Sequence, residues 1–445
     1  MADKDLTESP VKELLRRFLI TFLLGVVVYR LGVFVPIPGI DAKALASLVT
    51  AKGGDSDGLG ALLRYANMFN GGAIANASIF GLGITPYISA SIIFQLLAFS
   101  IPSLKQLQKE GESGRRKINQ YTRYATLLIC IVQAIIAAIA VVRYHDGDNI
   151  LVRTDNPLYF IIQSVVVIST GSMLILWIAE QITRHGIGNG VSIIIMIGIL
   201  AYLPSSFQGF GADLPKFLGI VLAALIIIAA IVVVVQAVRR INLEQQRRVQ
   251  GNKVYGGAQT TLPLKLNQAN VIPVIFASPV MVVLGFAAAR FGSSIGLDQL
   301  FAYGEPGHRY LFAGLIIAFT YFYISVTFDL FDLSNHFKQA GFFVRGIRPG
   351  KNTVDHLAAI LKRITFVGAI FLAVIAILPE LIGTAAFGLS GNSSTVLLGG
   401  TGLMIVVGVS LDVMQKVAAF FLAHQYRGLS GGEDIASARK PGKRF

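Results

Sequence analysis

Long apolar runs dominate this sequence and restrict what it can fold into. A transmembrane helix needs about 20 consecutive, mostly apolar residues, and ten stretches of roughly that length occur along the chain. They lie at 18–35, 77–99, 124–142, 158–179, 190–210, 217–238, 271–291, 310–331, 364–386 and 399–423. Only 14% of the residues are charged, whereas soluble proteins average about 25%. The sequence therefore predicts an all-α polytopic membrane protein.

The distribution of basic residues predicts its orientation. Lys and Arg are retained on the cytoplasmic side of a membrane, and ten spans place both termini on one side. With the termini in the cytoplasm, the segments on that side carry 28 Lys and Arg residues, and the opposite segments carry 8. Both termini are therefore expected to be cytoplasmic. Residues 1–17 lack the cleavage pattern of a secretory signal, so the first span is expected to be retained.

Few residues suited to catalysis or ion coupling occur in the apolar runs. The single cysteine, Cys130, allows no disulfide or cysteine metal site within one chain. The charged residues fall toward the ends of the runs, and Asp412 and Lys416, four residues apart, share a helix face on which they can pair. The glycine-rich stretch at 186–190 follows no strand, which argues against a phosphate site. We expect no catalytic residue, cofactor or metal.

Residues 67–95 are apolar enough for a span but contain several helix breakers, among them Gly81, Gly83 and Pro86. Irregular backbone at membrane depth is tolerated only where it is buried in protein or lines a wet cavity. This favours a pore or a transporter, and the lack of buried acids favours a pore. Gly81 and Gly83 are expected to permit close helix packing, and Pro86, between Ile84 and Ile88, to free backbone near the middle of the membrane.

Two long basic loops, 239–270 and 335–363, are candidate docking surfaces, because connections much longer than about 6 residues are often functional. They are also explained by topology alone, as basic segments near anionic lipid. Within GIRPG, Gly346, Pro349 and Gly350 are expected to hold Arg348 on a tight turn.

Seven motifs, in order along the chain, resemble one family. They are FVPIPGID (34–41), SIFGLGITPYISASIIFQLL (78–97), KEGESGRRKINQYTRY (109–124), WIAEQITRHGIGNGVSIII (177–195), LPLKLNQANVIPVIFAS (262–278), GIRPG (346–350) and LGGTGLMIVVGVSLD (398–412). Together they resemble the SecY/Sec61 family of protein-conducting channels, and its bacterial members in particular.

The resemblance implies ten transmembrane helices in two pseudo-symmetric inverted halves, 18–210 and 211–423, around a central hourglass pore. A cytoplasmic N-terminus (1–17) and a cytoplasmic tail (424–445) flank the halves. An apolar pore ring would be formed by Ile84, Ile88, Ile195, Ile275 and Ile405. Aliphatic side chains can close around any translocating sequence, and a hydrophobic constriction dewets and impedes ions. Any one isoleucine taken alone is equally explained by packing.

The family also has a plug helix on the extracytoplasmic side of the ring, which would lie here at about 62–74. The plug residues implied are Leu62, Met68, Phe69, Asn70, Gly71 and Gly72, with the two glycines turning the chain back into a crossing half at 78–95. The polar candidates for a lateral gate between spans two and three and spans seven and eight are Gln95, Gln133, Asn267 and Asn270. Such residues also often just bond a neighbouring helix.

The resemblance further implies partners. The ribosome and the motor ATPase SecA would contact Arg247, Arg248, Lys253 and Arg348. SecE and SecG would be companion subunits, signal peptides, nascent chains and membrane lipids would be ligands, and SecDF and YidC are further candidates. The location implied is the bacterial cytoplasmic membrane. Arg345 before GIRPG, the stretch 328–337 and Asn252 depart from the family pattern, which bears on partner preference.

Two other classes remain open. A secondary transporter also combines inverted repeats with broken helices, but it should have polar or charged side chains at a midplane site. A membrane-embedded insertase or scaffold would have no sealed resting state.

Overall fold

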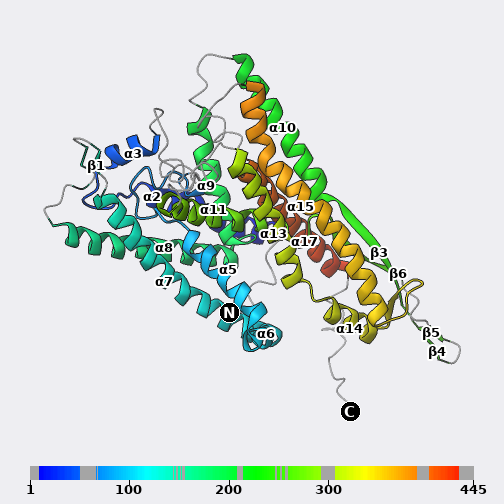
Figure 1. The fold of residues 1–445 in the computed structure, drawn as a ribbon. Coiled ribbons are helices and arrows are strands. Elements are labelled where there is room, and N and C mark those ends of the chain that lie inside the picture. The colour runs from blue at the N-terminus through cyan, green and yellow to red at the C-terminus, as the bar shows by residue number, and fades with distance from the viewer. Residues whose placement is uncertain are drawn as a thin grey trace, which may run out of the picture.

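The computed structural model describes most of the chain: residues 10–50, 67, 69–143, 145–146, 149–150, 152, 156–207, 214–245, 248–250, 253–255, 259–291, 306–387 and 400–429. Most of these residues are helical, and the helices form two groups that meet around α9 and α11 (Figure 1).

The first group begins with a continuous helical stretch made of α1 (Pro10–Phe22), the π-helix η1 (Leu23–Val28) and α2 (Tyr29–Val33). The helices that follow are α3 (Ala42–Thr50), α5 (Thr85–Ser100), α6 (Pro102–Lys109), α7 (Glu112–Arg143), α8 (Pro157–His185) and α9 (Gly190–Phe207). A short pair of strands, β1 (His145–Asp146) and β2 (Asn149–Ile150), lies between α7 and α8.

The second group contains the later part of the chain. Its helices are α10 (Leu214–Gln236), α11 (Ile272–Phe291), α13 (Pro306–Thr327), α14 (Leu330–Ala340), α15 (Lys351–Phe387) and α17 (Gly400–Leu429). Packing between the groups runs through α5 against α11 and through α17 against α9 and α1. Side chains of both groups therefore meet at the centre of the molecule.

Each of the ten predicted spans overlaps a helix of this structure. By length and composition, six helices of the described residues can cross a membrane, and a seventh candidate is the pair α5 and α6, bent by 105°. The six are 112–142, 157–185, 217–236, 306–340, 351–379 and 401–424. The chain is therefore a multi-pass membrane protein, and the count of ten spans stays a prediction.

The second span begins later than predicted. Residues 70–84, called the turn segment below, form consecutive turns, and α5 begins only at Thr85. Pro86 occupies the first turn of α5, where its missing N–H is unbonded in any case, and its expected effect on the backbone near the waist stays a prediction. Gly81 and Gly83 lie in turns rather than in a helix, and the turn segment bonds both within itself and to residues 32–37.

A sheet that the all-helical prediction omitted lies between α10 and α11. Strands β3 (Val238–Gln245) and β6 (Gln259–Lys265) pair in antiparallel fashion from Val238 with Lys265 to Glu244 with Gln259, and β7 (Phe342–Val344) adds to β3. The strands β4 (Arg248–Gln250) and β5 (Lys253–Tyr255) extend the hairpin outward (Figure 1).

The sheet is packed against helices rather than free in solvent. Ile241, Leu243 and Leu264 form a cluster of buried side chains with Val344 of β7 and Leu357 of α15. We call β3, β6, β7, α14 and the first turns of α15 the sheet platform. Both long basic loops thus belong to one folded unit.

Candidate functional site

The main hydrophobic cluster is built from helices of both groups. Ile84, Ile88, Ile195 and Ile405 are buried members of it, and Ile275 is a partly buried side chain packed against it. Ile84 directly precedes α5, and the others come from α5, α9, α17 and α11. The five predicted ring positions, far apart in sequence, are therefore brought to one cluster.

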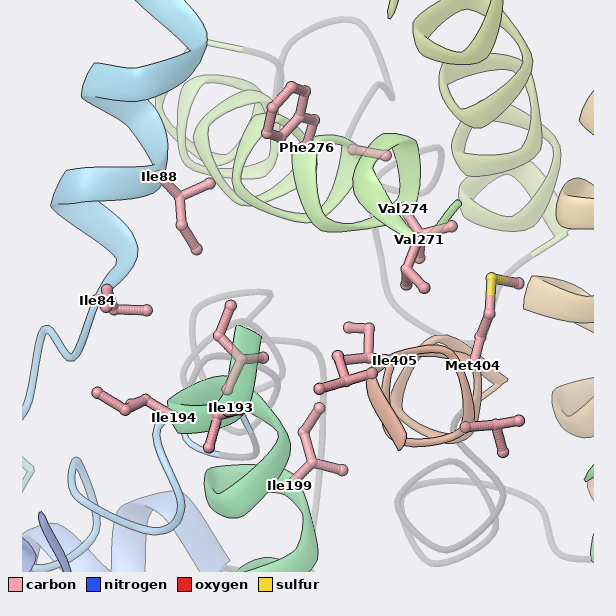
Figure 2. Close-up of a cluster of buried hydrophobic side chains, with 14 of the residues drawn as sticks. Ile84, Ile88, Ile193, Ile194, Ile199, Val271, Val274, Phe276, Met404 and Ile405 are labelled. Atoms are coloured by element: carbon pink, nitrogen blue, oxygen red, sulfur yellow. The ribbon is translucent and has the colours of Figure 1, made fainter. Parts of the chain in front are cut away.

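The close-up of this cluster shows how side chains from four parts of the chain face one another. Ile88 of α5, Ile193 of α9, Val271 just before α11 and Ile405 of α17 point toward one another (Figure 2). The sequence did not indicate Ile193, Val271 or Met404, which is 1% exposed. These helices are apolar on nearly all faces, so their hydrophobic pattern does not distinguish an inward face from a lipid-facing one.

The turn segment lies between the first helix and α9. Gly71 and Gly72 have φ angles of +63° and +88°, so the expected turn at these glycines is present. The expected plug helix is absent from 70–74, which are turns. Leu62 and Met68 lie outside the described residues. Phe69 is partly buried against the main cluster, and Asn70 is 6% exposed.

Internal hydrogen bonds keep the turn segment compact. The Asn70 side-chain Nδ2 donates to the Gly81 carbonyl at 2.8 Å, and the Ala75 backbone N–H donates to Asn67 Oδ1 at 2.9 Å. A Cβ atom at Gly83, where φ is +57°, would collide with Asn70 Oδ1. Gly83 is thus needed for close approach and for its backbone conformation.

The predicted docking residues lie on or beside the sheet platform. Arg348 is exposed in the turn before α15, where Gly346 and Gly350 have positive φ angles and the Thr353 hydroxyl donates to the Arg348 carbonyl at 3.0 Å. The tight turn predicted for GIRPG is confirmed. Arg248 and Lys253 begin β4 and β5, and Arg247 lies outside the described residues.

Comparison with known proteins decides the family. The SecY family model matches residues 78–414, and the protein translocase subunit SecY of Escherichia coli K12 is 41% identical over 429 residues, covering 93% of each chain. The chain belongs to the SecY family.

Solved structures agree with this fold at lower sequence identity. One described as "The structure of a protein conducting channel" has a TM-score of 0.61 and 17% identity, and covers 92% of this chain and 93% of that one. Another, "Sec61 in the Canine ribosome-channel complex from the endoplasmic reticulum", has a TM-score of 0.57 and 16% identity, and covers 92% and 93%. The SecY and Sec61 architecture therefore extends over nearly the whole chain.

The four lateral-gate candidates differ in their surroundings in this SecY-family fold. Gln95 of α5 donates to Ser91 Oγ at 3.3 Å, within its own helix. Asn267 is 4% exposed and donates to the Asn270 carbonyl at 3.0 Å. The Oε1 of Gln133 and the Oδ1 atoms of Asn267 and Asn270 are buried and accept no hydrogen bond from the described residues.

Asn270 lies next to α17 rather than at the seam between α5 and α11. Its Oδ1 lies 3.7 Å from where a Cβ of Gly408 would stand, so this side chain faces α17. Its φ of +54° also marks a turn position. The gate role of all four residues stays a prediction.

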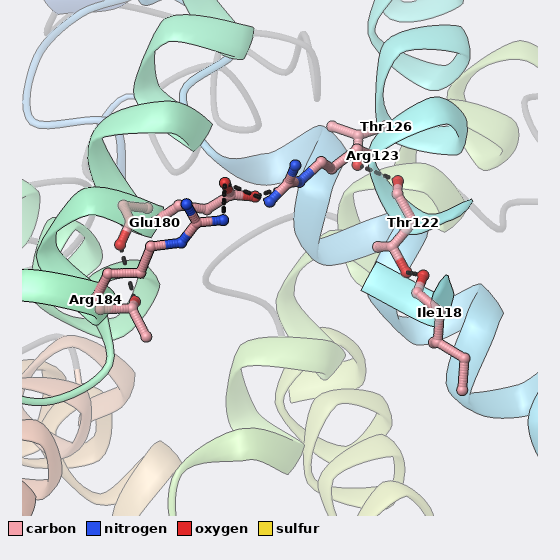
Figure 3. Close-up of polar contacts among 8 residues, drawn as sticks. Ile118, Thr122, Arg123, Thr126, Glu180 and Arg184 are labelled. Carbon is pink, nitrogen blue, oxygen red and sulfur yellow. Dashed lines mark hydrogen bonds and ion pairs between the residues drawn. The ribbon is translucent and has the colours of Figure 1, made fainter. Parts of the chain in front are cut away.

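A half-buried ion pair joins α7 to α8. Arg123 donates to Glu180 through Nε at 2.5 Å and through Nη2 at 2.6 Å, while Arg184 lies 3.9 Å from the same carboxylate (Figure 3). Asp412 and Lys416 pair at 2.7 Å, as predicted. The charges at these span ends are paired. No cluster of metal-binding side chains occurs within the described part of the chain.

Proposed function

We propose that this chain is the channel-forming subunit of a bacterial protein translocase, which passes unfolded secretory proteins across the cytoplasmic membrane. The observation that carries the proposal is the convergence of aliphatic side chains from α5, α9, α11 and α17 in one cluster, with its members drawn from both halves of a SecY-family fold.

Aliphatic side chains suit this task. They make no fixed hydrogen bonds, so a ring of them can close around any passing sequence and release it. At rest, a narrow apolar constriction excludes water and so impedes ions. The chain would need no catalytic residue, because a motor or a translating ribosome would drive transport.

The same proposal covers lateral release into lipid. The seam would lie where α5 and α7 meet α11 and α13, since α5 packs against α11. Signal peptides and transmembrane segments would leave there. Gln95, Gln133, Asn267 and Asn270 are the polar side chains proposed to line that path, with Asn270 on the side next to α17.

Orientation and partners follow from charge. We infer that both termini are cytoplasmic, and that the basic loops face the ribosome or SecA. In Figure 1, α6, α14 and the tip of the β3–β6 hairpin lie toward the lower edge, and α3 and β1 lie at the opposite side, as this orientation requires. RNA phosphate and acidic protein surfaces both suit arginine side chains. SecE, SecG, SecDF and YidC are proposed on family grounds alone.

Site-specific photo-crosslinking tests the channel role. A crosslinker at Ile275 or Ile405 should capture a secretory precursor stalled halfway through export, because the precursor must pass the ring. Leu222 of α10 is 59% exposed and serves as a lipid-facing control. If neither ring position captures the precursor while the control captures lipid, the channel role is wrong. A transporter would show no such capture.

A further inference from the structure

The first helix holds the turn segment through two neighbouring side chains. The Tyr29 hydroxyl donates to the Asn70 carbonyl at 3.2 Å, and Arg30 Nη1 donates to the Gly71 carbonyl at 3.0 Å. The two acceptors are consecutive backbone carbonyls. We propose that Tyr29 and Arg30 are positioning residues that keep the turn segment in its resting place beside the ring. This inference rests on the proposed channel function.

Both donors are set in place by aromatic neighbours. The Tyr29 ring stacks on Phe80 of the turn segment, with centroids 6.0 Å apart and an angle of 8° between the planes. The Arg30 guanidinium lies 5.0 Å from the centroid of the Phe34 ring. Tyr29 is 2% exposed. An arginine in an apolar helix is costly unless it is bonded, and the Gly71 carbonyl supplies that bond.

The bonded residues lie close to the ring. A Cβ atom at Gly198 of α9 would lie 2.7 Å from the Phe69 carbonyl oxygen and 3.4 Å from the Gly71 nitrogen. Gly198 is three residues from the ring position Ile195, within one turn of the same helix. A displacement of residues 69–71 from α9 would therefore open space directly beside the ring.

The remaining bonds join the turn segment to the end of the first helix and to the residues that follow it, and they are of a different kind. The Ile37 N–H donates to the Ala77 carbonyl at 2.7 Å, the Ile79 N–H donates to the Val35 carbonyl at 3.0 Å, and Ser78 Oγ donates to the Gly32 carbonyl at 3.0 Å. This end of the turn segment is anchored mainly through backbone. The end at 70–71 is held by side chains, so it can be released without breaking the backbone anchor.

The two contacts need different things from their partners. The acceptors at 70 and 71 are backbone carbonyls, whereas the donors are side-chain groups that substitution can remove. Resting closure would therefore be sensitive to substitutions in the first helix.

Resting anion permeability tests the inference. The full chain, with the subunits that copurify with it, is reconstituted in liposomes without precursor, and iodide efflux is measured. Arg30→Met should raise efflux about tenfold and Tyr29→Phe about threefold, as expected for losing a charged and a neutral hydrogen bond. Tyr29→Phe keeps the ring that stacks on Phe80. Arg30→Lys, which keeps the cation, should lie between wild type and Arg30→Met.

Matched controls separate this role from a folding defect. Leu31, next in sequence, is 65% exposed, and Leu31→Ala should leave efflux unchanged. The thermal stability of each purified complex is measured alongside. Unchanged efflux in both Tyr29→Phe and Arg30→Met would overturn the inference. If Arg30→Met fails to accumulate, Tyr29→Phe decides alone.

A ring variant distinguishes this inference from the channel function itself. Ile405→Ala should leak if the ring seals a pore. Leakage in Ile405→Ala without leakage in the Tyr29 and Arg30 variants would reject the positioning role and leave the channel standing. No leakage in any variant, together with no precursor capture at the ring, would reject the channel function.

Discussion

Gly198 is a residue at which one added methyl group should displace the chain at 69–71. Its Cβ would meet the carbonyl of Phe69, directly before the turn segment, and also lie 3.4 Å from the Tyr29 hydroxyl. Since the backbone carbonyl cannot rotate away as a side chain would, the turn segment itself would have to move. A packing conflict of this kind costs about 1–3 kcal/mol.

Gly198→Ala should therefore raise resting anion efflux several-fold in the same liposome assay, even though alanine favours the helix. Gly314→Ala in α13 is the matched control, because a Cβ there meets nothing within 4 Å, and it should leave efflux at the wild-type level. Equal efflux from the two variants would show that the turn segment does not depend on this close approach.

Residue roles could be predicted from sequence where the side chain or turn is distinctive. Arg348 on its glycine-flanked turn and the pair Asp412–Lys416 are examples. The inward face of α9 could not be predicted, because Ile193, Ile194 and Ile195 are consecutive and chemically identical. The donors Tyr29 and Arg30 were missed because their acceptors are backbone carbonyls. Every residue has one, so no sequence pattern marks these acceptors.

At the scale of elements, one bidentate ion pair adds to the packing of α7 against α8. Arg123 and Glu180 have side chains 39% and 25% exposed, so both charges are partly withdrawn from water. Removing one partner leaves the other charge unpaired. This lowers the stability of the folded protein more than replacing both charged residues together would.

Glu180→Gln should lower stability by about 1–3 kcal/mol, below the range for fully buried pairs because solvent still reaches both groups. The measurement is thermal unfolding of the detergent-solubilised complex. Glu112→Gln is the control: Arg116 and Glu112 are 77% and 82% exposed, and losing that pair should cost less than about 1 kcal/mol. Equal shifts for the two variants would contradict this account.

Helix length and composition predicted where the spans lie, but not the sheet or the start of the second span. β3 and β6 pair across thirteen intervening residues, and a predominance of charged and polar residues hid their strand pattern. The turn segment is apolar like a span, but positive φ angles at Gly71, Gly72 and Gly83 and its bonds to residues 32–37 keep it out of a helix. Such long-range pairing is decided by tertiary contacts.

At the scale of the whole molecule, the two long basic loops come together on the sheet platform and the adjoining turns, whereas the basic residues of 105–123 lie on α6 and α7. Arg348 is exposed there and lies on a fixed turn. Arg345, the departure from the family pattern, lies 3.7 Å from Glu244 of β3, although its side chain is 82% exposed. Arg348 is accordingly the better candidate for contact with an anionic partner surface.

Arg348→Glu should weaken partner binding about tenfold or more, as expected for losing a charged hydrogen bond, and should impair export while leaving protein abundance intact. Lys351→Glu makes the same charge change three residues away. Export assays and ribosome or motor binding at two salt concentrations are the measurements, since a phosphate contact weakens with salt. If Arg348→Glu exports normally, the basic residues of this loop serve only to set the membrane topology.

The way the β3–β6 hairpin is joined to the helices has a mechanical consequence. Ala237 alone separates α10 from β3, six residues separate β6 from α11, and the Leu266 N–H donates to the Ala237 carbonyl at 2.8 Å, closing the base of the hairpin. A force on the hairpin would therefore be expected to act on α10 through a one-residue, hydrogen-bonded joint, and on α11, which carries Ile275, through six residues.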